Sequence, residues 1–389
     1  MRTATRVGKS ILTSALLLGL MAASMGPAMA NQLPVIDDVR ISQTLLSPGE
    51  ELAISYRLAK DARVTALVYT PDYQVVRLLM DDIARPAGTN TLQWDGRDDK
   101  GNMVPDEAYL FSLQAKDNAG NLFAYDPTSF SGGGKADIRV ESMTPMPEGY
   151  EIRFSVQTPS RVSMRAGIHN GPLFATIVNW APYDKGAHTL YWNGMDTTGT
   201  LRAMDQDGAI LLPQGFQLPE NSIIVNGGNQ DYIAYSKALE ALQTTTTGVA
   251  VITVSTVRKS SLERTTQGVS TSFLVSRARH NAPRFEVKDP TGSPLASTRK
   301  TAAIPVSNHY PLTMEVNAED VEDFYEGRYE IVVFVDNQRF DEEESAQTPY
   351  TYVLDTTSLE NGIHQVTFNL AGLGGQVESY SFTIDVNNN

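Results

Sequence analysis

Short runs with apolar side chains at every second position recur along this chain, separated by Gly, Pro, Asn and Asp. The clearest runs are Ile54, Tyr56 and Leu58; Tyr109, Phe111 and Leu113; Ile152, Phe154 and Val156; and Val366, Phe368 and Leu370. Because successive side chains of a strand point to opposite faces, each run predicts a strand with one buried face. Many short strands with turn residues between them predict an all-β chain of β-sandwiches.

Two segments depart from this alternation. Tyr232, Tyr235, Leu239 and Leu242 have helical spacing, which predicts a short helix and a linker near residues 230–247. Residues 248–258 and 268–279 are rich in β-branched side chains and predict two long strands, which either complete the second domain or form a separate ribbon. The edge of 248–258 either pairs with 268–279 or accepts a strand from a partner.

An internal repeat predicts where the domains begin and end. A shift of 98 residues places Ile54 on Ile152 and Arg63 on Arg161, with no gap between residues 54 and 101. This pitch has the size of one sandwich. The predicted order is a signal peptide (1–30), sandwiches at 31–130 and 135–228, a linker with the helix and the ribbon at 229–280, and a third sandwich at 281–389. The linker segment either stands alone or belongs to the second sandwich.

The most similar stretches of the repeat are TLQWDGRDDKG at 91–101 and TLYWNGMDTTG at 189–199. The residues shared by both stretches that we expect to be structural are Trp94, Gly96, Gly101, Trp192, Gly194 and Gly199. Each Trp is predicted to point into a sandwich core, and the glycines to form the turn that follows. The acidic residues are less constant, because Asp95 and Asp99 are replaced by Asn193 and Thr197.

The first thirty residues have the features of a secretory signal peptide. Arg2, Arg6 and Lys9 precede an apolar stretch from Ile11 to Leu20, and Ala28 and Ala30 fit an A-x-A cleavage site. The apolar stretch is too short to cross a bilayer. We therefore expect cleavage after Ala30, no membrane span, and an extracytoplasmic protein in the periplasm, at the cell surface or in the medium.

Composition narrows the class of partner. The chain has no Cys, so its domains depend on buried apolar area and not on disulfides. It has 31 Lys and Arg against 45 Asp and Glu, a net charge of −14, and loss of the leader makes it more acidic. This charge disfavours nucleic acid and anionic membranes as partners. Gly132, Gly133 and Gly134 fall between the first two sandwiches and predict a flexible hinge.

No motif in the sequence indicates catalysis. The five His residues have no metal-ligand spacing, and neither a G-x-S-x-G nor a phosphate-binding loop is present. The acidic loops at Asp95, Asp98, Asp99, Asp205 and Asp207 allow two interpretations. They are either turn residues that bond nearby backbone N–H groups or a Ca²⁺ site built from several oxygens. The turn interpretation is favoured, and no cofactor is expected.

The turn W-D/N-G-x-D-x-x-G, followed in the first copy by a Y-x-F strand and D-x-A-G-N, resembles the immunoglobulin-like domain of flagellar hook-capping proteins over about residues 35–225. The C-terminal unit is similar to another bacterial immunoglobulin-like module through Asp355, Thr356, Asn361 and Gly362. The resemblance implies tandem immunoglobulin-like sandwiches and says little about function. The flagellar role is not implied, because hook-capping proteins are exported without a cleaved signal peptide.

Together these features predict a secreted, non-enzymatic protein of several immunoglobulin-like domains. It would act as a structural or protein-interaction module at the cell envelope or in an extracellular assembly. The alternative is a carbohydrate-binding or carbohydrate-processing accessory protein, for which Trp180, Tyr183 and Tyr191 in the second domain are the candidate glycan contacts.

Overall fold

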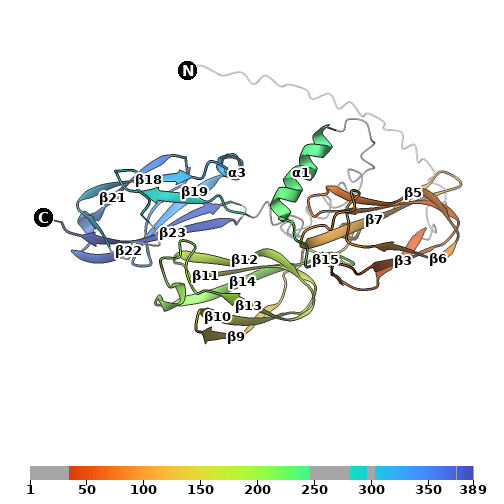
Figure 1. The fold of residues 1–389 in the computed structure, drawn as a ribbon, viewed down its shortest axis with the longest axis horizontal. Helices are drawn as coiled ribbons and strands as arrows, with labels where there is room; N and C mark the ends of the chain where they lie inside the picture. Colours follow the sequence, from red (N-terminus) through yellow and green to blue (C-terminus); the bar gives the residue numbers. More distant parts are fainter. Residues whose placement is uncertain (1–34, 246–280, 296–302, 374, 389) are drawn as a thin grey trace, which may run out of the picture.

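The computed structural model describes residues 35–245, 281–295, 303–373 and 375–388. Within these ranges the chain forms three β-sandwiches with two α-helices, which confirms the predicted all-β fold and the helix near residues 230–247 (Figure 1). The predicted signal peptide (1–30) and the two predicted strands at 248–258 and 268–279 lie outside the described residues.

The first sandwich packs a sheet of three strands against a larger sheet. The small sheet has the order β1 (Ile36–Ile41), β3 (Leu52–Leu58), β6 (Gly88–Trp94). The large sheet has the order β2 (Leu45–Leu46), β15 (Ile223–Val225), β7 (Glu107–Asp117), β4 (Ala62–Tyr69), β5 (Val75–Arg85), with β8 (Leu122–Tyr125) also paired to β7 and a 3₁₀ turn η1 (Pro127–Ser129) after it. The alternating apolar residues face one core between these sheets.

The second sandwich repeats this arrangement with three strands in each sheet. One sheet has the order β13 (Gly186–Trp192), β10 (Gly149–Val156), β9 (Ile138–Met146). The other has the order β12 (Leu173–Tyr183), β11 (Ser160–Ile168), β14 (Ala209–Gln217), with a 3₁₀ turn η2 (Ala203–Asp205) before β14. The repeat extends to the pairing register, because Leu52 pairs with Trp94 and, 98 residues on, Tyr150 pairs with Trp192.

The first sandwich is completed by chain that follows the second. The sequence places residues 223–225 at the end of the second sandwich, but β15 pairs with β7 of the first, Ile223 opposite Tyr109 and Val225 opposite Glu107. β15 lies between β2 and β7, and all three of its residues are buried, so its insertion removes apolar surface from water. The second sandwich is therefore inserted into the first.

Helix α1 (Tyr232–Thr245) also belongs to the first sandwich. Tyr235 and Leu239 pack against the first core, and the Gln74 amide donates to the Ser236 carbonyl oxygen at 3.1 Å. The helix was predicted as part of a linker that stands alone or joins the second sandwich. Its contacts instead attach it to the first sandwich, at the turn between β4 and β5.

The third sandwich has its own core. One sheet has the order β16 (Phe285–Lys288), β18 (His309–Val316), β21 (Tyr350–Asp355), and the other β17 (Ile304–Val306), β23 (Val377–Val386), β22 (Gly362–Gly372), β19 (Tyr329–Val335), β20 (Gln338–Glu343). Helix α3 (Val321–Gly327) precedes β19, and the 3₁₀ turn η5 (Thr356–Ser358) follows β21. Phe368 stacks on Phe382 within this core and meets Tyr352 edge-on.

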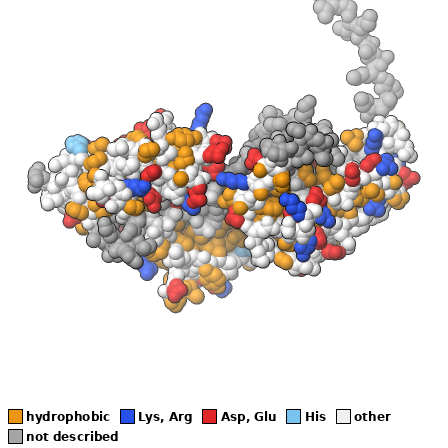
Figure 2. Space-filling view, turned by 45° about the horizontal axis from the view of Figure 1, so that its top comes forward, with side chains coloured by type: hydrophobic (Ala, Val, Ile, Leu, Met, Phe, Trp, Pro, Cys, Tyr) orange, Lys and Arg blue, Asp and Glu red, His pale blue; other side chains and the backbone are white. Residues whose placement is uncertain are grey.

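The surface carries charges of both signs. On the face drawn in Figure 2, acidic and basic side chains are interspersed over the sandwiches. Among the described residues, no helix has the length and apolar character needed to cross a bilayer.

Candidate interaction site at the sandwich junctions

The repeated turn has the same geometry in both copies. The indole Nε1 of Trp94 donates to the Arg97 carbonyl oxygen at 2.9 Å, and that of Trp192 to the Met195 carbonyl oxygen at 3.2 Å. Gly96 and Gly194 have φ angles of 73° and 77°, a region that favours glycine. A Cβ atom at Gly96 would lie 2.8 Å from Met103 Cε, the end of a flexible side chain, so the backbone conformation favours glycine there more strongly than the space does. Gly101 and Gly199 close the two turns with φ angles of 82° and 70°.

The acidic residues of the first turn are engaged by the chain itself. Asp98 is buried, and its Oδ1 accepts from the backbone N–H groups of Lys100 and Asn102 at 3.0 and 2.8 Å. Oδ1 of Asp95 accepts from Arg97 N–H at 3.1 Å, and Oδ1 of Asp99 accepts from Leu78 N–H at 3.1 Å. The bonds of Asp95 and Asp98 have the pattern of Asx turns, whereas Asp99 ties the turn to β5.

Asp205 and Asp207 lie after the second turn, which retains only Asp196 at the position of Asp98. Asp205 closes the 3₁₀ turn η2, whereas Asp207 is exposed two residues further on. The part of the chain that the structure describes contains no group of three or more His, Cys, Asp or Glu side chains placed to hold a metal ion. The Ca²⁺ interpretation therefore has no preassembled ligand set among these residues.

The chain passes between the first and second sandwiches twice, and the two connecting segments lie side by side. Gly133 N–H donates to the Gln217 carbonyl oxygen at 2.9 Å, and Gln217 N–H donates to the Gly134 carbonyl oxygen at 2.7 Å. The glycine run predicted as a flexible hinge is thus paired with the returning chain. A double crossing resists bending more than a single linker, because rotation about one crossing strains the other.

A fully buried ion pair joins the two sandwiches. Arg161 on β11 and Glu107 on β7 are both 0% exposed at their side chains, and Arg161 Nη2 lies 2.8 Å from Glu107 Oε1. Arg161 Nη1 also donates to Glu107 Oε2 at 3.1 Å and to the Trp180 carbonyl oxygen at 2.9 Å. Glu107 Oε1 accepts a further bond from Ala108 N–H. The guanidinium contacts both carboxylate oxygens, with one hydrogen bond through Nη1, whereas the buried Nη2 and Nε have no hydrogen-bond partner among the described residues, and the contact links β11 to β7.

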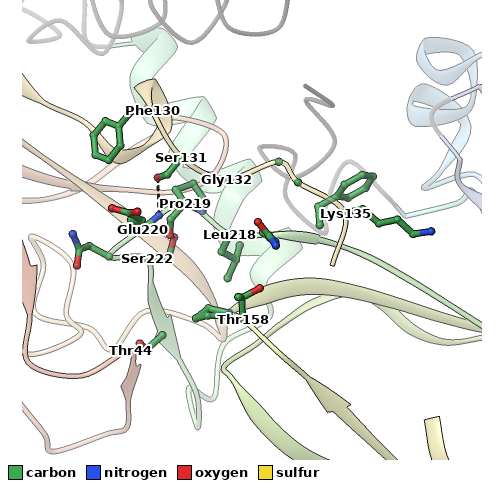
Figure 3. A pocket seen from close by; sticks show the side chains of 16 residues that line it. Thr44, Phe130, Ser131, Gly132, Lys135, Thr158, Leu218, Pro219, Glu220 and Ser222 are labelled. Atoms are coloured by element: carbon green, nitrogen blue, oxygen red, sulfur yellow. Dashed lines mark hydrogen bonds between the residues drawn. The ribbon is translucent and has the colours of Figure 1, made fainter. Parts of the chain in front are cut away.

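A cavity of about 840 Å³ opens beside the double crossing (Figure 3). Its walls come from both crossings and from loops of each sandwich, with Phe130 and Leu218 as apolar walls and Lys135 and Glu220 as charged groups. Ser131 Oγ accepts from Glu220 N–H at 2.8 Å, so the two crossings are also joined at this end. The volume falls in the range of small-molecule sites, but the described walls contain no cluster of catalytic groups.

A second junction holds the third sandwich against the second. The Asn369 side chain bonds Leu173 at the start of β12 twice: Leu173 N–H donates to Oδ1 at 2.8 Å, and Nδ2 donates to the Leu173 carbonyl oxygen at 2.8 Å. The amide thus mimics a neighbouring strand at the edge of the sheet. Ser379 Oγ donates to the same carbonyl at 2.7 Å, and Thr200 Oγ1 donates to the Ser381 carbonyl oxygen at 3.1 Å.

The second copy of the repeated turn is part of this junction. Thr197 lies within hydrogen-bonding reach of the Glu378 carboxyl group at the start of β23. Burial raises the pKa of Glu378 to about 7, against the opposing effects of the Ser379 backbone and the Thr197 hydroxyl. An aspartate at position 197, as at the equivalent Asp99, would place a second carboxylate beside Glu378. Threonine at position 197 therefore avoids repulsion between two neighbouring carboxylates.

The three aromatic residues of the glycan alternative do not form a row. Trp180 is 4% exposed and stacks on Phe216, with ring centroids 5.4 Å apart. Tyr183 packs edge-on against the core residue Phe154 at 5.1 Å. Only Tyr191 is exposed.

The residues that form both junctions were not singled out from the sequence. Arg161 was noted only as the repeat partner of Arg63. Asn369 alternates with the apolar residues Val366, Phe368 and Leu370, so the sequence predicts it on the exposed face of its strand and does not mark it as a buried polar group. Glu107 carries no signal either.

Known proteins support the fold assignment. Residues 42–119 match the FlgD Ig-like domain family, which confirms the resemblance to hook-capping proteins over the first sandwich. No curated protein matches the chain. The match of this one domain to the family indicates a structural or interaction module built from immunoglobulin-like sandwiches.

Solved structures with related modules have low identity to this chain. The fibronectin(III)-like modules of CbhA from Clostridium thermocellum are 10% identical, with 90% of this chain and 94% of that chain covered and a TM-score of 0.19. FlgD from P. aeruginosa is 18% identical, with 40% and 98% covered and a TM-score of 0.20. A bacterial ice-binding adhesin of 1.5 MDa is 10% identical, with 92% and 100% covered and a TM-score of 0.16. At these TM-scores the superpositions identify neither a partner nor a function.

Proposed function

We propose that this protein is a secreted, non-enzymatic rigid support that holds three immunoglobulin-like sandwiches in a fixed arrangement at the cell envelope or in an extracellular assembly. The observation that carries the proposal is the buried ion pair between Arg161 and Glu107. Removing two charges from water is costly, so a pair of this kind stays intact only while both sandwiches keep one orientation.

The junction between the second and third sandwiches also restricts their relative movement. Asn369, Ser379 and Thr200 bond backbone groups across the boundary between the second and third sandwiches. Backbone groups have fixed positions, so these bonds tolerate little sliding. A rigid series of sandwiches suits a protein that spaces or presents its loops, where immunoglobulin-like domains commonly carry their binding residues.

Small-angle X-ray scattering of residues 31–389 tests the rigid arrangement. We expect one compact particle whose scattering profile fits the three sandwiches as placed here. A profile that requires an ensemble of independently moving sandwiches would contradict the proposal. Substitution of Arg161 by Met should shift the profile towards such an ensemble, whereas Arg63→Met should leave it unchanged.

The secreted location needs a separate experiment. We expect the protein from the periplasm, the cell surface or the medium to begin at Asn31, as N-terminal sequencing would establish. An uncleaved chain that stays in the cytoplasmic fraction would overturn the location and leave the rigid-support proposal standing.

A further inference from the structure

The outer face of the β13-β10-β9 sheet differs from its counterpart in the first sandwich in ways that folding does not require. Tyr191 pairs across the strands with Glu151, at the positions where the first sandwich has Gln93 and Ala53. Arg153 stands where the first sandwich has Ser55. Both sets of residues point away from the core in the same register. The second sandwich therefore carries an aromatic ring, a carboxylate and a guanidinium where the first has smaller or uncharged side chains.

The added residues form a bonded group on the surface. Tyr191 is 72% exposed, and its hydroxyl donates to Glu151 Oε2 at 3.2 Å. Arg153 Nε donates to Glu151 Oε1 at 2.8 Å, while its side chain remains 60% exposed. Glu151 thus bonds both the tyrosine hydroxyl and the guanidinium. The result is a preorganised aromatic surface beside donors and acceptors.

A hollow of about 460 Å³ adjoins Tyr191 at the end of the sheet. Met146, Tyr150 and Trp192 line it, and the Tyr150 and Trp192 rings stack with centroids 6.0 Å apart. In the first sandwich the equivalent Trp94 is 1% exposed, because Leu46 of β2 and Val225 of β15 share its core cluster.

Neither sheet of the second sandwich has strands at those positions, as far as the described chain shows. Trp192 is accordingly only partly buried, and its ring borders the hollow.

We propose that the outer face carrying Tyr191, Glu151 and Arg153, together with the hollow that Tyr191 and Trp192 line at the end of the sheet, binds a carbohydrate chain of β-linked sugars with equatorial hydroxyl groups. Such sugars present a flat face of C–H groups that stacks on an aromatic ring, while the ring-edge hydroxyls bond to a carboxylate and a guanidinium. Glu151 and Arg153 supply the acceptor and the donors, and the hollow extends the contact beyond one sugar.

The size of the face favours a sugar over a protein. A stable protein interface buries about 800 Å² on each partner and contains a cluster of apolar anchors. The large apolar side chains exposed on this sheet are Met146 and Tyr191 alone among the residues placed by the structure. A hollow of 460 Å³ lies instead within the range of small-molecule and oligosaccharide pockets.

Titration of residues 31–389 with cellohexaose and with chitohexaose, followed by calorimetry and by Trp fluorescence, tests the proposal. The chain has three Trp, and Trp94 and Trp180 are buried, so a fluorescence change reports Trp192. We expect saturable binding of at least one of these sugars. Trp192→Phe should abolish the fluorescence change while calorimetric binding persists.

Matched variants separate this site from nonspecific binding. Tyr191→Ala should weaken binding by about tenfold or more, as for other central aromatic anchors, and Arg153→Ala should weaken it as well. Gln93→Ala, the exposed counterpart in the first sandwich, should bind like the unmodified protein. Equal thermal melting of the three variants would show that folding is intact. Absence of binding to both sugars at millimolar concentration, or unchanged affinity of Tyr191→Ala, would overturn the proposal.

Discussion

Arg161 occupies in the second sandwich the position that Arg63 occupies in the first, and both guanidinium groups donate to the carbonyl oxygen of a residue with positive φ in the next strand. That residue is Asp82 in the first copy and Trp180 in the second, with φ angles of 49° and 48°. The paired carboxylate differs. Arg63 bonds the Asp82 side chain at the surface, whereas Arg161 bonds Glu107 of the other sandwich. A local bond of the repeat has thus become a bond between domains.

This difference predicts unequal costs for equivalent substitutions. Arg161→Met leaves the buried carboxylate of Glu107 without its counter-ion, so the free energy of unfolding should fall by about 3–5 kcal/mol. Arg63→Met breaks an exposed pair and should cost about 0–1 kcal/mol. Urea unfolding followed by circular dichroism measures both values.

The double variant Arg161→Met with Glu107→Leu is the decisive control. It removes both charges, so it should recover most of the stability lost in the single variant. A double variant that stays as unstable as Arg161→Met would show that the pair does not act through its buried charge.

The raised pKa of Glu378 predicts that the stability of the third sandwich and its junction falls as the pH rises. Its pKa is raised by burial to about 7, above the ordinary value for a glutamate, so the folded state binds the proton more tightly than the unfolded chain. The resulting stabilisation is fully present below about pH 4.5, declines as the pH rises, and is lost above pH 7. Thermal melting between pH 5 and pH 8 should show a falling midpoint.

Glu378→Gln isolates this group from other titrating residues. Burial disfavours protonation of His364, but its bonds to Asp336 and Glu360 outweigh that effect and raise its pKa, so His364 also loses stabilisation as the pH rises. Glu378→Gln should therefore reduce the pH dependence without abolishing it. An unchanged pH profile in this variant would contradict the assignment to Glu378.

Thr197→Asp should open the junction between the second and third sandwiches. The new carboxylate would lie beside Glu378, where two like charges in a partly buried site repel. Because the chain has no Cys, spin labels can be attached at one introduced Cys in each sandwich. Pulsed electron resonance should then report a longer and broader distance distribution.

The reverse exchange in the first copy serves as the control. Asp99→Thr removes an exposed carboxylate whose oxygen accepts from Leu78 N–H, so it should leave the label distances unchanged. Equal broadening in both variants would show that the effect of Thr197→Asp is not specific to Glu378.

Calcium should not stabilise the protein. Oδ1 of Asp98 already accepts two backbone bonds, so the first turn would have to give up its own hydrogen bonds to coordinate a cation. We expect the same melting midpoint in millimolar CaCl₂ and in EDTA. A rise in the midpoint with calcium, abolished by Asp98→Asn, would establish a cation site at this turn.

The repeat, its strands and its turns could be predicted from the sequence because they depend on local signals. Alternation places Ile54 and Ile152 on buried faces, and Gly96 and Gly194 mark positions where other residues would be strained. Trp180 shows where alternation fails. A bulge in β12 shifts the register between Val162 and Met164, so Trp180 turns onto Phe216 instead of outward.

The junctions could not be predicted in the same way. The apolar triplet Ile223–Val225 predicts a buried strand but not which sheet it joins. Arg161 and Arg63 are the same residue in the same repeat position, and only the neighbouring sandwich makes one of them buried. Partners that lie 54 residues apart along the chain, such as Glu107 and Arg161, leave no periodic trace in a single sequence.

The insertion of the second sandwich also determines an order of assembly. β7 lacks the β15 neighbour of its finished sheet until residues 223–225 have been synthesised, so about a hundred residues of nascent chain separate it from that strand. Glu107 has its counter-ion available earlier, once Arg161 of β11 has been synthesised. The first sandwich therefore cannot be completed before the second, because β15 follows the second sandwich along the chain. A completed first sandwich thus implies that the inserted domain has already been synthesised.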